Sequence, residues 1–112
     1  MFLNSVSWVE ISGTTYHRGD VVVTDTDLVP VFGVVEDIVV DSMQCHYLVC
    51  EVLSTICFVR HFHSYEVATQ SPTVYYICKP TSLFDNTVLG RYQLASHPSF
   101  FVPLKYHLVE HL

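Results

Sequence analysis

The sequence predicts an all-β protein, folded as a small closed or nearly closed barrel. Short segments rich in Val, Ile, Tyr, Phe and Thr recur from residues 19–23 to residues 74–77. Turn-forming residues interrupt them at short intervals, and no stretch before the C-terminal part has the apolar spacing of a helix. β-branched and aromatic side chains fit the pleated, half-buried surface of a sheet, so these segments are expected to be strands.

The first half of the chain supplies the first expected strands. Residues 2–11 alternate weakly between apolar and polar side chains, and residues 16–24 form the first clear strand. Residues 31–40 form a long strand, with Pro30 at its start because proline cannot donate to a ladder. Gly33 inside that strand indicates a bulge or bend, as a small barrel needs to turn a corner.

The second half completes a five-stranded meander. Residues 45–53 pair back, and the short polar pair Ser54-Thr55 is expected to connect them to residues 56–62 as a hairpin. A short helical turn is expected at residues 64–67 and a loop at residues 69–72, before a fifth barrel strand at residues 73–78.

The whole chain is expected to be one domain, with the barrel core at residues 16–80 and an irregular extension at residues 81–112. Within the extension, residues 100–108 are expected to form a further strand, interrupted at Pro103. A chain of 112 residues can bury a core without disulfide or metal staples.

Charged residues are scarce, which predicts an exposed apolar surface. Half of the residues are hydrophobic and 14% are charged, against about a quarter in average globular proteins. An exposed apolar patch on such a domain usually marks a partner surface. Such a surface is expected of a homodimer, and equally of a chain that belongs to a larger protein.

The charge balance narrows the class of partner. The formal net charge is −6, with five Lys and Arg residues, which argues against direct non-specific binding of nucleic acid. A negative surface suits a basic protein or peptide tail, although an acidic face can also serve only to keep the domain in solution.

Cysteine usage and the apolar runs indicate an intracellular protein. The four cysteines form no CxxC pair, and three of them lie in strand-like apolar runs where a free thiol behaves as a small hydrophobe. A signal peptide has a basic start followed by a long apolar core, and the N-terminal residues show neither feature. The apolar runs are also too short to span a bilayer, so no membrane contact is expected.

Three segments of the sequence resemble a known class of domain. They are Gly19-Asp20-Val21-Val22-Val23, Pro30-Val31-Phe32-Gly33-Val34-Val35 and His46-Tyr47-Leu48-Val49-Cys50. Together they resemble the opening strands of BAH, Tudor and related SH3-like chromatin domains, over residues 16–80. The resemblance implies an SH3-like five-stranded barrel and a chromatin-associated, nuclear setting. Residues 61–67 and 104–107 more weakly resemble an uncharacterised module of transposon-derived and zinc-finger-bearing animal proteins, which implies no activity.

An aromatic cage is one candidate site. In barrels that bind methylated tails, aromatic faces surround the methylated ammonium because ring quadrupoles attract the cation. The mouth of an SH3-like barrel favours Tyr16, Phe32 and Tyr65, with Asp25 and Asp27 as acidic neighbours. The same rings could instead fill the core, as most aromatic side chains do.

A His-x-His pair is the alternative site. On a strand, His61 and His63 would project to the same face, and Glu66 could add a third ligand to one divalent metal. The spacing to Glu66 is shorter than in cupin barrels, and an exposed pair of histidines is more often plain surface. This alternative would make the protein a small metal-dependent barrel enzyme.

Sequence features favour a non-enzymatic module that binds a protein or peptide and self-associates, without a cofactor. No nucleophile elbow, glycine-rich phosphate loop or calcium loop is present in the sequence. The uncharged segment at residues 73–78 cannot stay bare at a sheet edge without inviting pairing, so the C-terminal segment or a partner strand is expected to cover it.

Overall fold

The computed structural model describes residues 3–26, 28–93 and 99–103, and within these ranges the protein is all-β, as predicted. No α-helix occurs in the described ranges, and the two short 3-10 turns are η1 (Arg60–Phe62) and η2 (Pro80–Ser82). The strands are β1 (Asn4–Val6), β2 (Trp8–Ile11), β3 (Thr14–His17), β4 (Val21–Thr26), β5 (Pro30–Val40), β6 (His46–Val59), β7 (Ser64–Cys78), β8 (Asp85–Leu89) and β9 (Phe100–Pro103).

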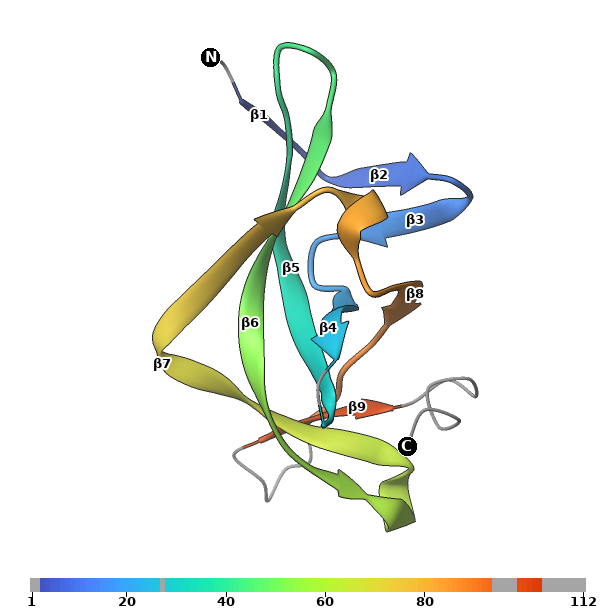
Figure 1. Cartoon of the computed structure of the whole chain (residues 1–112), viewed down its shortest axis with the longest axis vertical. Helices are drawn as coiled ribbons and strands as arrows, with labels where there is room; N and C mark the ends of the chain where they lie inside the picture. The colour runs from blue at the N-terminus through green and yellow to red at the C-terminus, as the bar shows by residue number, and fades with distance from the viewer. Residues whose placement is uncertain (1–2, 27, 94–98, 104–112) are drawn as a thin grey trace.

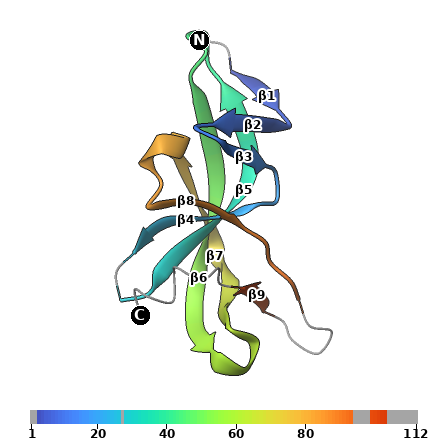
Figure 2. The ribbon, with the colours of Figure 1, turned by 90° about the vertical axis from the view of Figure 1, so that its right-hand side faces the viewer.

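Seven strands form one antiparallel sheet in the order β8-β4-β5-β6-β7-β9, with β1 paired to the far end of β5. β2 and β3 form a separate hairpin. Figure 1 shows β5, β6 and β7 as the long spine of the sheet, and Figure 2 shows how strongly these strands twist.

The sheet curls into a half-barrel around one of two cores. Leu89 on β8 and Val102 on β9 belong to opposite ends of the strand order, yet both are buried in the same cluster. Only a curled sheet can bring those two ends together. The members of this first core are Val21, Val23, Phe32, Val34, Leu53, Tyr65, Val67, Leu89 and Val102.

A second core explains the valine run of β4. Successive side chains of a strand point to opposite faces, so Val21 and Val23 enter the first core while Val22 enters the second. All three valines are fully buried. The members of the second core are Val9, Tyr16, Val22, Val35, Ile38, Leu48, Cys50 and Cys78.

β5 carries the predicted irregularity, but Gly33 does not form it. The register between β5 and β6 shifts between Val35 and Asp37, which places the bulge at Glu36. Gly33 serves a close approach instead, because a Cβ there would lie 3.0 Å from the Cβ of Cys50 and 3.1 Å from Cγ2 of Thr24.

The strand expected at residues 16–24 is two strands, so that prediction was wrong in detail. The chain turns between β3 and β4 at Gly19, whose φ of 89° is a conformation that favours glycine. The backbone N–H of Gly19 donates to the carbonyl oxygen of Val35 at 2.8 Å, and the backbone N–H of His17 donates to Oδ2 of Asp20 at 2.7 Å.

Ser54-Thr55 does not connect a hairpin, which corrects a second expectation. β6 continues through both residues, because Ser54 pairs with Ala68 and Oγ1 of Thr55 donates to the carbonyl oxygen of Pro30 at 2.8 Å. The hairpin turn lies later, at η1, where His63 adopts a left-handed conformation with φ of 49°. Residues 64–67, expected to be helical, are the start of β7.

The loop expected at residues 69–72 lies inside β7, where it makes a wide bulge. Leu53 pairs with Thr69 and its neighbour Val52 pairs with Val74, so residues 70–73 have no partner residue on β6. Within this bulge, Nε2 of Gln70 donates to the carbonyl oxygen of Val52 at 3.3 Å. β7 bends sharply near its middle (Figure 1).

Two segments of the C-terminal extension, β8 and β9, are part of the sheet. β8 pairs with β4, and β9 pairs with Ser64–Val67 at the start of β7. β9 confirms the further strand expected near residue 100, as far as Pro103; residues 104–108 of that expectation lie outside the described residues.

Candidate functional site

The three rings predicted to form a cage are core residues and do not meet. Tyr16 lies in the second core, whereas Phe32 and Tyr65 lie in the first, with ring centroids 5.6 Å apart. All three are 1% exposed or less. As placed, they cannot enclose a ligand, because the long β5 and β6 strands separate the two clusters on opposite faces of the sheet.

The acidic neighbours of that cage lie elsewhere. Asp25 is exposed at the end of β4, where its Oδ1 accepts a hydrogen bond from the backbone N–H of Thr26 at 2.8 Å. Asp27 lies outside the described residues. Tyr16 contributes to a depression of about 220 Å³ with Ile11 and Pro80, which holds no acidic side chain.

The His-x-His pair does not share a strand face. His61 lies in the 3-10 turn η1 and His63 follows it in a left-handed conformation, so the alternation that would align their imidazoles is absent. Glu66 lies on β7, where its Oε1 accepts a weak hydrogen bond from Sγ of Cys57 at 3.7 Å. No three His, Cys, Asp or Glu side chains in the described ranges gather as a metal site requires.

The open edge of β7 is the feature that calls for a ligand. β9 pairs only with Ser64–Val67, and within the described part of the chain no strand pairs with the outer side of residues 69–78. Every residue from Ser71 to Ile77 is exposed, and none is charged. Figure 1 shows this half of β7 at the outer margin of the sheet. Its outward N–H and C=O groups can accept another strand.

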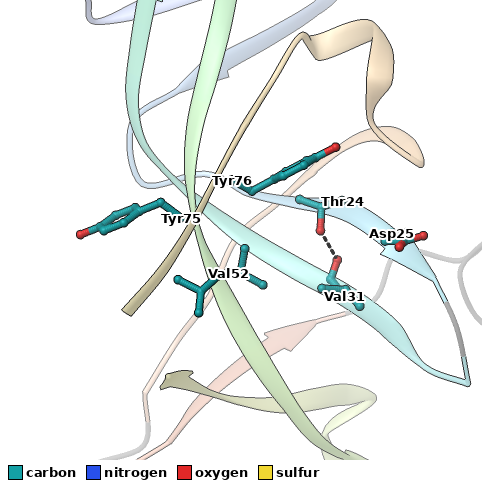
Figure 3. Close-up of a pocket in the computed structure, with 7 residues that line it drawn as sticks. Thr24, Asp25, Val31, Val52, Tyr75 and Tyr76 are labelled. Carbon is teal, nitrogen blue, oxygen red and sulfur yellow. Dashed lines mark hydrogen bonds between the residues drawn. The ribbon is translucent and has the colours of Figure 1, made fainter. Parts of the chain in front are cut away.

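A groove of about 270 Å³ lies along one side of this edge. Figure 3 shows Tyr75 and Tyr76 pointing to opposite sides of β7, with Tyr76 directed towards Thr24. The groove is lined by Thr24, Asp25, Val31, Val52, Val74, Tyr75 and Tyr76. Most of these residues are apolar, and Asp25 is the one charged residue among the described residues that line the groove.

The opposite face of this edge is apolar around Ile77 and carries an acidic side chain, Glu51, next to Tyr75. Ile77 pairs with Val49 and Tyr75 pairs with Glu51, so each pair shares that face. Ile77 and Tyr75 are 64% and 61% exposed. A second depression, also of about 270 Å³, is lined by Leu3, Val39, Asp41, Tyr47, Val49 and Ile77.

Two carboxyl groups meet beside Tyr75. Partial burial raises the pKa of Glu51, and both a hydrogen bond with the Glu36 carboxyl and the charge of that carboxyl raise it further. The positive charge of Arg91 opposes this shift. Arg91 also lies over the ring of Phe100, with its guanidinium carbon 4.6 Å from the ring centroid. The face therefore places two neighbouring carboxyl groups next to the exposed ring of Tyr75.

Residues 73–78 were recognisable in the sequence as a strand that could not stay bare, but Tyr75, Tyr76 and Glu51 were not identified as site residues. The uncharged run Thr73-Val74-Tyr75-Tyr76-Ile77 was the available signal. The contribution of Glu51 depends on the β6–β7 register, which the sequence alone did not provide.

No family model matches the chain, and no curated protein or solved structure matches it either. No helix in the described ranges is long and apolar enough to cross a membrane.

Proposed function

We propose that this chain is a non-enzymatic protein-binding module that takes up an extended partner segment along the open edge of β7. The observation that carries the proposal is the exposed, uncharged and unpaired outer side of Thr73–Ile77 in the described structure. Monomeric proteins protect such edges with charge, proline or a covering element. Here Pro72 lies at the bend, before the edge, and among the described residues no charge, proline or further strand protects the edge itself.

Strand addition supplies both affinity and selectivity at this edge. Main-chain hydrogen bonds to β7 would hold the partner, and pockets for alternate side chains would select it. The groove beside Tyr76 and the depression beside Ile77 lie on opposite faces of the same strand. Successive side chains of an added strand would therefore point alternately towards the groove and towards the depression.

The charge of the protein supports a basic partner. The net charge is −6, and Asp25, Glu36 and Glu51 lie near the edge or line its groove. The resemblance to Tudor and BAH domains extends the proposal to a Lys- and Arg-rich nuclear protein. The proposal needs no methylated side chain, because Tyr16, Phe32 and Tyr65 fill the cores.

The test is selection of seven-residue peptides from a random library on the wild-type protein, followed by fluorescence anisotropy of the selected peptides. Tyr75→Lys places a charge on the edge opposite Glu51 and is expected to abolish binding while preserving the fold. Leu28→Lys, at a residue that is 93% exposed in the β4–β5 connection, is the matched control and should bind normally. Failure to select peptides, or equal binding to Tyr75→Lys, would contradict the proposal.

A further inference from the structure

Building on the proposed strand addition, we infer that the β7 edge selects a partner segment with one Lys or Arg between two apolar residues. The basic residue lies opposite Tyr75, on the face that carries Glu51 and Glu36. The apolar residues on either side of it lie opposite Val74 and Tyr76, on the face that carries the groove. If strand addition itself does not occur, this inference has no basis.

The basic position follows from the pairing of Tyr75 with Glu51. A residue of an added strand directly opposite Tyr75 points to the same face as Tyr75 and Glu51. Its side chain would cross the exposed Tyr75 ring, whose face attracts a cation. Lys and Arg are long enough to continue over that ring towards the Glu51 carboxyl, while their apolar stems cover the ring.

The carboxyl pair makes this position electrostatically complementary to a cation. Glu36 and Glu51 come from adjacent strands, and the bulge at Glu36 brings its carboxyl to that of Glu51. Two carboxylates in contact repel each other when both are ionised, so an added positive charge relieves that repulsion. The positive charge of Arg91 acts on Glu51 in the same sense as the proposed cation would.

The apolar positions follow from the alternation of side chains along a strand. The neighbours of the basic residue point to the other face, where Val74 pairs with Val52 and Tyr76 lies over the groove. Val31 and Val52 provide the apolar lining of that groove, and Asp25 lies at its Thr24 end. Because the pattern is symmetric about the basic residue, it fits an added strand of either direction.

The test uses a labelled peptide, Ser-Thr-Ile-Lys-Ile-Thr-Ser, and its twin with Gln in place of Lys. The wild-type protein should bind the Lys peptide about two- to fivefold more tightly, the range expected of an exposed charge pair. The double variant Glu36→Gln/Glu51→Gln should lose that preference, and Glu10→Gln, on the separate β2–β3 hairpin, should keep it. Salt at about 1 M, where the Debye length is ~3 Å, should also remove it.

The outcomes separate this inference from the proposed function. Equal binding of both peptides to the wild type, a preference that survives in the double variant, or a preference lost in Glu10→Gln would overturn the basic position and leave strand addition intact. Absence of binding by both peptides, or equal binding to Tyr75→Lys, would count against strand addition itself. A wild-type dimer in sedimentation that Tyr75→Lys converts to monomer would make a second copy the occupant and overturn the inference.

Discussion

Tyr75 lies directly opposite Glu51 across the β6–β7 pair, so an exposed aromatic ring and a half-buried carboxyl group share one face at the free edge of the sheet. Aromatic rings usually find burial, and carboxyl groups usually find solvent or a cation. Within the described protein the Tyr75 ring remains 61% exposed, and the half-buried Glu51 carboxyl has the Glu36 carboxyl and the positive charge of Arg91 as its neighbours. A change at Glu51 is therefore expected to alter both the folding stability of the free protein and the proposed binding of a partner strand.

Glu51→Gln is expected to stabilise the folded protein at neutral pH and to weaken its binding of the Lys-containing peptide. The pKa of Glu51 is raised in the folded state by burial and by Glu36, so its ionised form disfavours folding. The penalty is fully present above the folded pKa and disappears as pH falls towards the unfolded value of about 4.3. In thermal melts, the melting temperature of Glu51→Gln should exceed that of the wild type at pH 7, and the difference should shrink towards zero as the pH falls to about 4.3.

The control for this change is Glu10→Gln, which removes the same charge on the separate β2–β3 hairpin. A lower melting temperature of Glu51→Gln than of the wild type at neutral pH would show that the Glu51 carboxylate stabilises the free protein. That result would contradict the prediction that ionised Glu51 disfavours folding.

Asp41→Asn is expected to destabilise the protein at neutral pH. Oδ1 of Asp41 accepts hydrogen bonds from the backbone N–H groups of Met43 at 2.8 Å and Cys45 at 3.0 Å, and Oδ2 accepts one from the Tyr47 hydroxyl at 3.2 Å. The hydrogen bond from Cys45 is the largest cause of the lowered pKa of Asp41.

Because that folded pKa lies below the unfolded value of about 3.9, the stabilisation is present above that pH and is lost as pH falls through the folded pKa. Chemical denaturation at a series of pH values should show the difference between wild type and Asp41→Asn closing in acid. A difference that is unchanged in acid would mean that the Asp41 charge is not its source.

Gly33→Ala is expected to cost about 1–3 kcal/mol, in the range of overpacked cores. The added Cβ would lie 3.0 Å from the Cβ of Cys50 on the paired strand, where the backbone has little room to shift. Gly90→Ala is the matched control, since a Cβ there would lie more than 4 Å from the heavy atoms of all described residues except its chain neighbours, and its change should stay within about 0.5 kcal/mol. Urea denaturation of both variants measures the difference; equal stabilities would show that β5 and β6 are less closely packed.

Tyr65→Phe is expected to leave stability unchanged or raise it by about 1 kcal/mol. The Tyr65 hydroxyl is buried, and it has no hydrogen-bond partner among the described residues. Removing it ends the cost of an unpaired polar group while the ring keeps its contacts with Phe32 and Phe58. Tyr47→Phe, which deletes the donor to Asp41, should lower stability in the same thermal assay. A clear loss in Tyr65→Phe would reveal a partner for the hydroxyl.

The sequence predicted the fold class well because strand propensity and alternation are local. β5 was expected almost to the residue, since Pro30 marks its start and the turn at Asp41 its end. The length of β6 was missed because Ser54 and Thr55 have turn-like composition, while their side chains and backbone are used by neighbouring strands. Distant partners override local composition in such cases.

The candidate site was predictable only in part, for a related reason. An exposed apolar surface and a bare strand at residues 73–78 followed from composition. The burial of Tyr16, Phe32 and Tyr65 depends on which face each strand turns to a core, and the register shifts near Phe32, between Val23 and Asp25, and near Tyr65, between Thr55 and Cys57, change that face along the sheet. Those register shifts left too little trace in the sequence to be placed.

Amide hydrogen exchange of Thr73–Ile77, measured by NMR with and without a selected peptide, shows directly whether a partner strand adds to the open edge of β7. If a partner strand adds to the open edge, the amides that face away from β6 should exchange more slowly in the complex, while those around Leu28 should not change. Unchanged exchange along Thr73–Ile77 at saturating peptide, with slowing elsewhere in the molecule, would contradict binding at this edge.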